Sequence, residues 1–132
     1  LGTGLVLVPL ALRKRLGGGM RQAGVLAAAG LHALDHHVQR LPEDHENARL
    51  LAELLCRIPG AASLFPVETN LAFVAFAGRS AADLSARLAR EGVLANPEGS
   101  RPDVLRFVTH LDVSRADVEE AARRAARALA AA

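Results

Sequence analysis

Apolar residues along the chain recur at two different spacings, and each spacing predicts one kind of element. Across residues 20–40 they recur every three or four positions, which places them on one broad stripe of a helix. The stripe consists of Val25, Leu26, Ala29, Leu31, Leu34 and Val38. A second helix is expected from Pro42, a residue suited to a first helical turn, and it should stop at Pro59 and Gly60.

Short runs rich in valine and phenylalanine predict strands in the second half of the chain. Residues 70–76 and 104–109 are the two clearest runs, and residues 93–95 suggest a third, shorter strand. Residues 96–102 contain the glycine, proline, serine and asparagine typical of turns, so they are expected to form a loop.

Two serines are placed to begin helices. Ser80 is expected to cap a helix that ends near Gly92, and Ser114 a last helix from Arg115 to about Ala130. The order helix, helix, strand, helix, strand, strand, helix indicates an α/β fold with α+β character. We expect two parts: a connector over residues 1–40, with a glycine turn and a long helix, and a small C-terminal α/β domain over residues 41–132.

The apolar run at residues 1–12 does not resemble a membrane segment. It is shorter than the roughly 20 residues that span a bilayer. Its positive charges follow the apolar residues, whereas a secretory signal carries them in front. We interpret the run as a buried strand or helix, or as divergent sequence at the edge of a fragment.

Composition narrows the classes of function. Basic and acidic residues number 16 and 14, for a net charge of +2, and no basic stripe alternates with aromatic residues. Neither nucleic acid nor membrane is therefore an expected partner. Cys56 is the single cysteine, so an internal disulfide cannot form and a reduced, cytoplasmic location is expected.

The run Arg13-Lys14-Arg15-Leu16-Gly-Gly-Gly-Met20-Arg21 has the chemistry of an anion site. Glycines let the backbone approach a ligand, and a helix that starts after them would present free N–H groups. Lysine and arginine side chains could complete the site, with phosphate as the most suitable guest. The alternative is a flexible turn with solvated charges, and the residues alone leave both interpretations open.

Histidines are the other candidates for chemistry. His32 and His36 are one helical turn apart, with Asp35, His37 and His45 nearby, a spacing that could hold a divalent metal. An exposed polar helix face is the favoured interpretation, because no pattern such as H-E-x-x-H is present. No metal is expected.

His110 lies at a predicted strand end, beside Arg106 and before Asp112. We expect it to form local hydrogen bonds that shape the loop, since nothing in the sequence supports a catalytic proton role.

Two long motifs resemble low-specificity threonine aldolases. Lys14 and the run L-G-G-G-M-R-Q-A-G-V-L-A-A-A-G at residues 16–30 are similar to the segment R-K-x-L-G-G-G-M-R-Q-x-G-x-L-A-A-A of that family. The run R-F-V-T-H-L-D-V-S at residues 106–114 is similar to its R-x-V-T-H-L-D-V-S. The resemblance extends from about Arg13 to the end of the chain.

The resemblance implies a fold, a cofactor and roles for three residues. Enzymes of that family have the aspartate-aminotransferase-like fold (fold type I), form homotetramers and use pyridoxal 5'-phosphate. They cleave L-threonine and L-allo-threonine to glycine and acetaldehyde. Lys14 and Arg21 match residues that contact the cofactor phosphate in a neighbouring subunit, and Arg106 matches the arginine that holds the substrate carboxylate.

The Schiff-base lysine of the family belongs to a separate, upstream motif. Lys14 is the single lysine of this sequence, and the resemblance assigns it to phosphate, so no catalytic residue is assigned here. The chain is expected to be a C-terminal part that is inactive alone. Two alternatives remain: a non-catalytic remnant, and an oligomerisation or phosphate-binding module.

Overall fold

The structure, a computed structural model, describes the backbone of residues 3–130 and the side chains of residues 9–129. Its contacts divide the chain into two compact units, Leu1–Val38 and Gln39–Ala132. Each unit is described by itself. No helix in the described range is long and apolar enough to cross a membrane.

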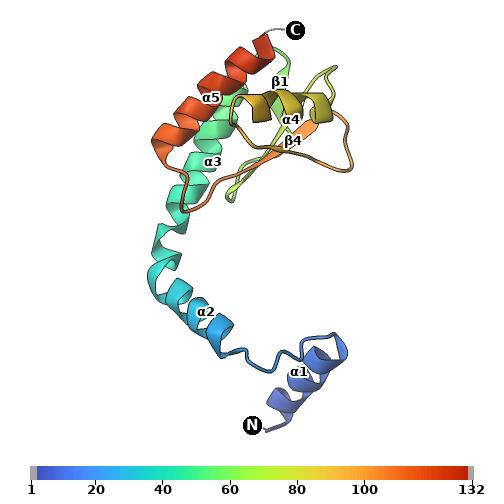
Figure 1. Cartoon of the computed structure of the whole chain (residues 1–132), viewed down its shortest axis with the longest axis vertical. Helices are drawn as coiled ribbons and strands as arrows, with labels where there is room; N and C mark the ends of the chain where they lie inside the picture. Colours follow the sequence, from blue (N-terminus) through green and yellow to red (C-terminus); the bar gives the residue numbers. More distant parts are fainter. Residues whose placement is uncertain (1–2, 131–132) are drawn as a thin grey trace. The chain divides into compact units, whose positions relative to one another are not determined.

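The first unit contains two helices joined by the glycine turn. Helix α1 spans Thr3–Arg15 and α2 spans Gly24–His36 (Figure 1). The predicted turn is confirmed: Gly17 has φ +86°, and the N–H of Gly18 donates to the carbonyl of Arg13 at 2.8 Å. That positive φ favours glycine over any residue with a side chain.

Two expectations for this unit need correction. Of the run at residues 1–12, the part from Thr3 is helical, but its described side chains are exposed rather than buried, because no described residue packs over them. Residues 1 and 2 lie outside the described part. The following helix begins at Gly24 rather than near Met20, because residues 21–23 form a further turn.

A short 3-10 turn, η1 (Val38–Arg40), includes the first residues of the second unit and leads into α3 (Leu41–Leu55). Pro42 lies in the first turn of α3, as predicted. One side of α3 is buried, with Leu51 and Leu55 in the core.

Four antiparallel strands form the sheet, in the order β1-β2-β4-β3. The two central strands, β2 (Leu71–Phe76) and β4 (Val104–Val108), confirm the two clearest predicted strands. The edge strands are β1 (Ala61–Ser63), which the sequence did not reveal, and β3 (Asn96–Pro97).

The third predicted strand was placed slightly too early. Residues 93–95 are not a strand: the N–H of Val93 still bonds the carbonyl of Leu88, and Ser85 Oγ donates to the carbonyl of Ala95 at 2.6 Å. Pairing with β4 starts at Asn96, inside the predicted loop.

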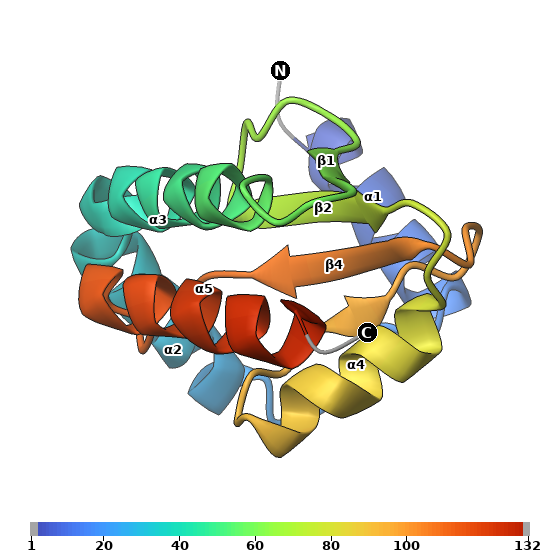
Figure 2. The same ribbon diagram turned by 90° about the horizontal axis from the view of Figure 1, so that it is seen from above.

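Three helices cover one face of this sheet (Figure 2). They are α3, α4 (Ala81–Arg90) and α5 (Arg115–Ala130). Alternate residues of the central strands, including Val74, Phe76, Leu105 and Phe107, are buried on that face. The opposite face carries the alternate, more exposed positions, as the twofold period of a half-buried sheet requires.

Candidate functional site

Arg106 lies in the middle of β4 on the face that no helix of its unit covers. Its neighbours Leu105 and Phe107 are almost fully buried, while Arg106 is exposed. Successive side chains of a strand point to opposite faces, so burying the neighbours on the helix-covered face fixes Arg106 on the open face. The rigid central strand thus presents one guanidinium outward.

Two neighbouring strands place residues on either side of Arg106. Phe73 on β2 and Asn96 on β3 are its register partners. Next to this row, Leu71 pairs with Val108, and both are exposed. The open face therefore combines one cation, one amide and an apolar surface.

The Arg106 side chain has no internal partner in the part of the chain that the structure describes. Among the described residues, it makes no hydrogen bond and no ion pair. Arg101 provides a contrast, since it contacts Asp103 at 2.9 Å, and that hydrogen bond lowers the pKa of Asp103. An unpaired guanidinium keeps its planar donors available for an external carboxylate.

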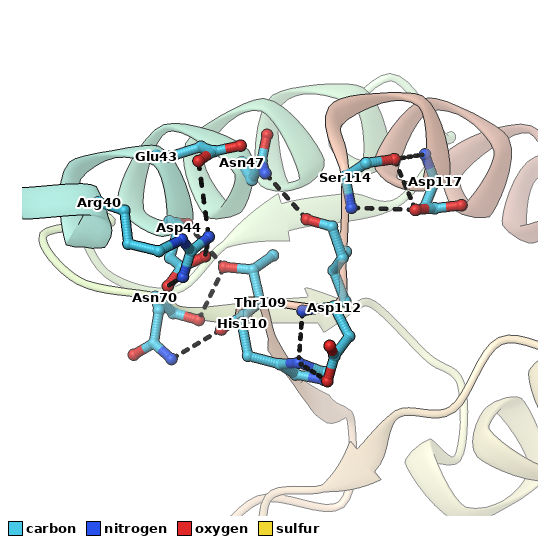
Figure 3. Close-up of polar contacts among 11 residues, drawn as sticks. Arg40, Glu43, Asp44, Asn47, Asn70, Thr109, His110, Asp112, Ser114 and Asp117 are labelled. Atoms are coloured by element: carbon cyan, nitrogen blue, oxygen red, sulfur yellow. Dashed lines mark hydrogen bonds and ion pairs between the residues drawn. The ribbon is translucent and has the colours of Figure 1, made fainter. Parts of the chain in front are cut away.

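A polar network holds the segment that follows Arg106 (Figure 3). Thr109 is buried, and its hydroxyl donates to the carbonyl of Asp44 at 2.6 Å. Its backbone N–H donates to the carbonyl of Asn70, and Asn70 Nδ2 donates back to the carbonyl of Thr109 at 2.8 Å. Asn47 Nδ2 donates to the carbonyl of Val113 at 3.1 Å. The end of β4 is thereby fastened to α3 and to the start of β2.

The same network includes an ion pair at the start of α3. Arg40 contacts both carboxylate oxygens of Asp44, at 2.9 and 3.0 Å, and lies 3.6 Å from Glu43 (Figure 3). The hydrogen bond to Asp44 raises the pKa of Arg40. The bidentate pair fixes the carboxylate of Asp44, and the backbone carbonyl of that residue accepts the Thr109 bond.

His110 and Ser114 act locally. The N–H of Asp112 donates to His110 Nδ1 at 3.3 Å, which agrees with the loop-shaping role expected for that histidine. Ser114 Oγ accepts from the N–H of Asp117 at 3.2 Å, and the N–H of Ser114 donates to the Asp117 carboxylate at 2.9 Å. This reciprocal capping begins α5, and the hydroxyl of Ser114 lowers the pKa of Asp117.

Lys14 and Arg21 belong to the first unit, on either side of the glycine turn. Both side chains are exposed, and neither forms a hydrogen bond or an ion pair within the described part of the chain. A Cβ on Gly18 would lie 2.6 Å from Arg13 Cγ, so the turn packs tightly against the end of α1. Because α2 starts at Gly24, the expected helix N-terminus directly after the glycines is absent.

The histidine group of α2 forms a small aromatic cluster. The ring centroid of His32 lies 4.4 Å from that of His36 and 5.5 Å from that of His37. Over the described residues, no three histidine, cysteine or acidic side chains are grouped so that they could hold a metal ion.

Sequence reasoning did not single out Phe73 and Asn96 as neighbours of Arg106. Strand register gives this information, and Asn96 had been placed in a loop. Asn47, Asn70 and Thr109 were also missed as a network. The sequence did offer one signal for this network. Asparagine and threonine side chains at the ends of helices and strands often form hydrogen bonds with nearby backbone groups.

Comparison with known proteins identifies the family. A family model described as beta-eliminating lyase matches residues 9–79, more than half of the chain. The low specificity L-threonine aldolase of Escherichia coli K12 is 46% identical over 110 residues, which are 83% of this chain and 31% of that protein. A probable low-specificity L-threonine aldolase 2 of Arabidopsis thaliana is 43% identical over 82% of this chain and 31% of its own length. The chain thus spans about a third of the length of these relatives.

Solved structures agree on the fold. The cysteine desulfurase CsdA of Escherichia coli superposes with a TM-score of 0.71 over 80% of this chain and 29% of its own, at 22% identity. The α-aminoadipate aminotransferase LysN of Thermus thermophilus gives a TM-score of 0.54 over 64% of this chain and 24% of its own, at 24% identity. These likenesses confirm the mixed α/β class and the aminotransferase-like fold, and with the family match they lead to one conclusion: the chain belongs to the beta-eliminating lyase family.

Proposed function

We propose that this chain is the C-terminal part of a pyridoxal-phosphate-dependent threonine aldolase, which cleaves L-threonine and L-allo-threonine to glycine and acetaldehyde. The observation that carries the proposal is the unpaired Arg106 on the open face of the sheet, within a motif shared with that family. The identity to the Escherichia coli aldolase over most of the chain supports the same reaction.

Arg106 binds the carboxylate of the amino-acid substrate. A guanidinium offers two parallel N–H groups that match the two oxygens of a carboxylate. The buried neighbours on β4 and the network at Thr109 hold the strand, so little conformational freedom is lost when the substrate binds. Anchoring one end of the substrate orients the rest of it for cleavage.

Lys14 and Arg21 bind the phosphate of the cofactor. Both are exposed and unpaired in the described structure, and both flank a turn with glycines, which leave the backbone accessible. This set of donors fits a phosphate dianion. When bound, pyridoxal phosphate supplies an electron sink for the negative charge left when the Cα–Cβ bond breaks.

The two cations serve a neighbouring subunit of a homotetramer located in the cytoplasm. The apolar residues of α2 support an assembly, because large side chains such as Val25, Leu31 and Leu34 are 78%, 63% and 67% exposed in this chain. Large apolar side chains exposed to this extent on one helix favour contact with another part of the protein or with another subunit.

The lysine that holds the cofactor covalently belongs to the remaining part of the enzyme, so this chain alone is inactive. The two alternatives, a non-catalytic remnant and an oligomerisation or phosphate-binding module, lack that reaction. They are separated from the aldolase by assaying glycine and acetaldehyde from threonine. The complete polypeptide should release both products, and this chain alone should release neither.

Cofactor affinity tests the phosphate assignment. In the complete polypeptide, Lys14→Ala and Arg21→Ala should each raise the Kd for pyridoxal phosphate by about 10-fold or more, because each removes a charge-assisted contact to phosphate. Arg49→Ala removes an exposed arginine of α3 that has no partner among the described residues. It is the matched control, with an unchanged Kd expected. Unchanged affinity in both test variants would contradict the assignment.

A further inference from the structure

We propose that Asn96 is a positioning residue for the carboxylate-binding Arg106, and that its neutral amide is required for this role. The inference rests on the proposed function, since it concerns how Arg106 meets its substrate. Asn96 belongs to the short edge strand β3, whose pairing with β4 places it directly beside Arg106.

The sheet register carries the geometry. Asn96 and Arg106 are opposed residues of an antiparallel pair, so their side chains emerge on the same face with Cβ atoms about 4.5–5.5 Å apart. Both side chains are exposed, and within the described structure Asn96 has no side-chain hydrogen bond. Its amide is therefore free to act at the guanidinium.

The opposite flank of Arg106 is apolar. Phe73 is its partner on β2, and the Phe73 ring contacts Phe65 edge to face at a centroid distance of 6.0 Å. A guanidinium between an aromatic side chain and an amide has one flank that offers only a π face and one flank that offers an oxygen acceptor. Asn96 Oδ1 is thus the acceptor that the neighbouring strands supply.

The charge of Arg106 explains why a neutral amide, rather than a carboxylate, lies beside it at position 96. Arginine has five N–H donors, and a bidentate carboxylate uses two of them. An amide oxygen can orient a remaining N–H without neutralising the cation. A carboxylate at the same place would itself form the bidentate pair and would occupy the group that the substrate needs.

Glu98, two positions after Asn96, does not pair with Arg106 in the described structure. Glu98 directly follows β3, and its backbone N–H donates to the carbonyl of Val104 on β4. Its carboxylate accepts from the hydroxyl of Ser100 at 2.6 Å and from the N–H of Ser100 at 3.0 Å. These bonds hold the carboxylate in its own loop, and within the described part of the chain Glu98 makes no ion pair with Arg106.

The test compares Asn96→Asp and Asn96→Ser in the complete enzyme. Asn96→Asp should raise the KM for threonine by about 10- to 100-fold, because the new carboxylate competes for Arg106. Asn96→Ser should raise KM by about 3- to 10-fold, since the shorter serine side chain does not reach the guanidinium and the orienting hydrogen bond proposed for the substrate complex cannot form. Gln39→Glu introduces the same charge change at an exposed position of the same unit and should leave KM unchanged.

Two further measurements separate positioning from a merely structural role. The Tm of Asn96→Asp should equal or exceed that of the wild type, because an ion pair is gained while substrate binding weakens. The affinity for glycine should fall in this variant, whereas the affinity for methylamine, which is glycine without its carboxylate, should not change.

The outcomes distinguish this inference from the function on which it rests. If both Asn96 variants keep the wild-type KM while loss of Arg106 raises it, Asn96 has no positioning role and the function stands. If loss of Arg106 leaves KM unchanged, the proposed function falls, and the inference falls with it. A KM increase accompanied by a lowered Tm and by equal losses for glycine and methylamine would also overturn the inference.

Discussion

At the scale of single residues, Thr109 shows how a buried hydroxyl can connect distant parts of the chain. Its donor bond reaches the carbonyl of Asp44, a residue 65 positions away. Thr109 itself is only 1% exposed, so the carbonyl that it satisfies has little access to water as a substitute partner.

Replacing this hydroxyl should therefore destabilise the protein. Thr109→Val keeps the shape of the side chain but removes the donor, and we expect the free energy of unfolding to fall by about 1–2 kcal/mol. Urea denaturation measures the change. Thr69→Val, the same substitution at an exposed position, is the control. It removes only a long, exposed bond of 3.3 Å from the N–H of Leu71, which water can replace, and should cost less than about 0.5 kcal/mol. Equal stability of Thr109→Val and the wild type would show that the hydrogen bond from Thr109 to the Asp44 carbonyl does not stabilise the fold.

The candidate site residues could be named from the sequence, whereas their surroundings could not. Lys14, Arg21 and Arg106 stand within recognisable motifs, and charged side chains suggest their own chemistry. Asn96 could not be placed beside Arg106, because the position of a two-residue edge strand depends on pairing with β4 rather than on a local pattern.

At the scale of elements, the sequence predicted the start of a helix correctly where a capping side chain forms a hydrogen bond with the first turn of that helix. Ser80 caps α4 by accepting from the N–H of Asp83, as expected, and Ser114 caps α5. The start of α2 was misplaced because Ala23, which precedes it, makes no side-chain cap. Without a capping side chain, apolar spacing alone defines a helix, and its ends are then poorly determined.

The cap of α5 should make stability depend on pH. The hydroxyl of Ser114, and then its N–H, lower the pKa of Asp117 below the ordinary value of 3.8. The folded state therefore favours the ionised carboxylate, so this stabilisation is fully present above pH 3.8 and is lost as the pH falls through the lowered folded-state pKa.

Asp117→Asn removes that titrating group. Its Tm should lie below that of the wild type near neutral pH, and the difference should shrink as the pH falls below about 4. Thermal unfolding over a pH series measures this. Glu53→Gln, at an exposed carboxylate without a hydrogen bond among the described residues, should show no such difference. A Tm difference between Asp117→Asn and the wild type that stays constant with pH would contradict the capping account.

At the scale of the whole molecule, the chain consists of two units that differ in how much apolar surface each one buries. The second unit has a sheet, three covering helices and a buried core, whereas α2 in the first unit contains no buried residue. An amphipathic helix normally gains its stability by packing its apolar face. The helix predicted from apolar spacing is confirmed as α2, but the predicted stripe extended to Val38, which lies in η1, and no residue of α2 is buried within the described part of the chain.

The central claim concerns Arg106, and the kinetics of threonine cleavage test it most directly. In the complete enzyme, Arg106→Gln should lower kcat/KM for threonine by about 100-fold or more, because it removes the charge-assisted bidentate contact to the substrate carboxylate. Arg90→Gln, at an exposed arginine of α4 that forms no ion pair or hydrogen bond within the described range, should keep the wild-type value. A folded Arg106→Gln enzyme that cleaves threonine as efficiently as the Arg90→Gln control would contradict the account.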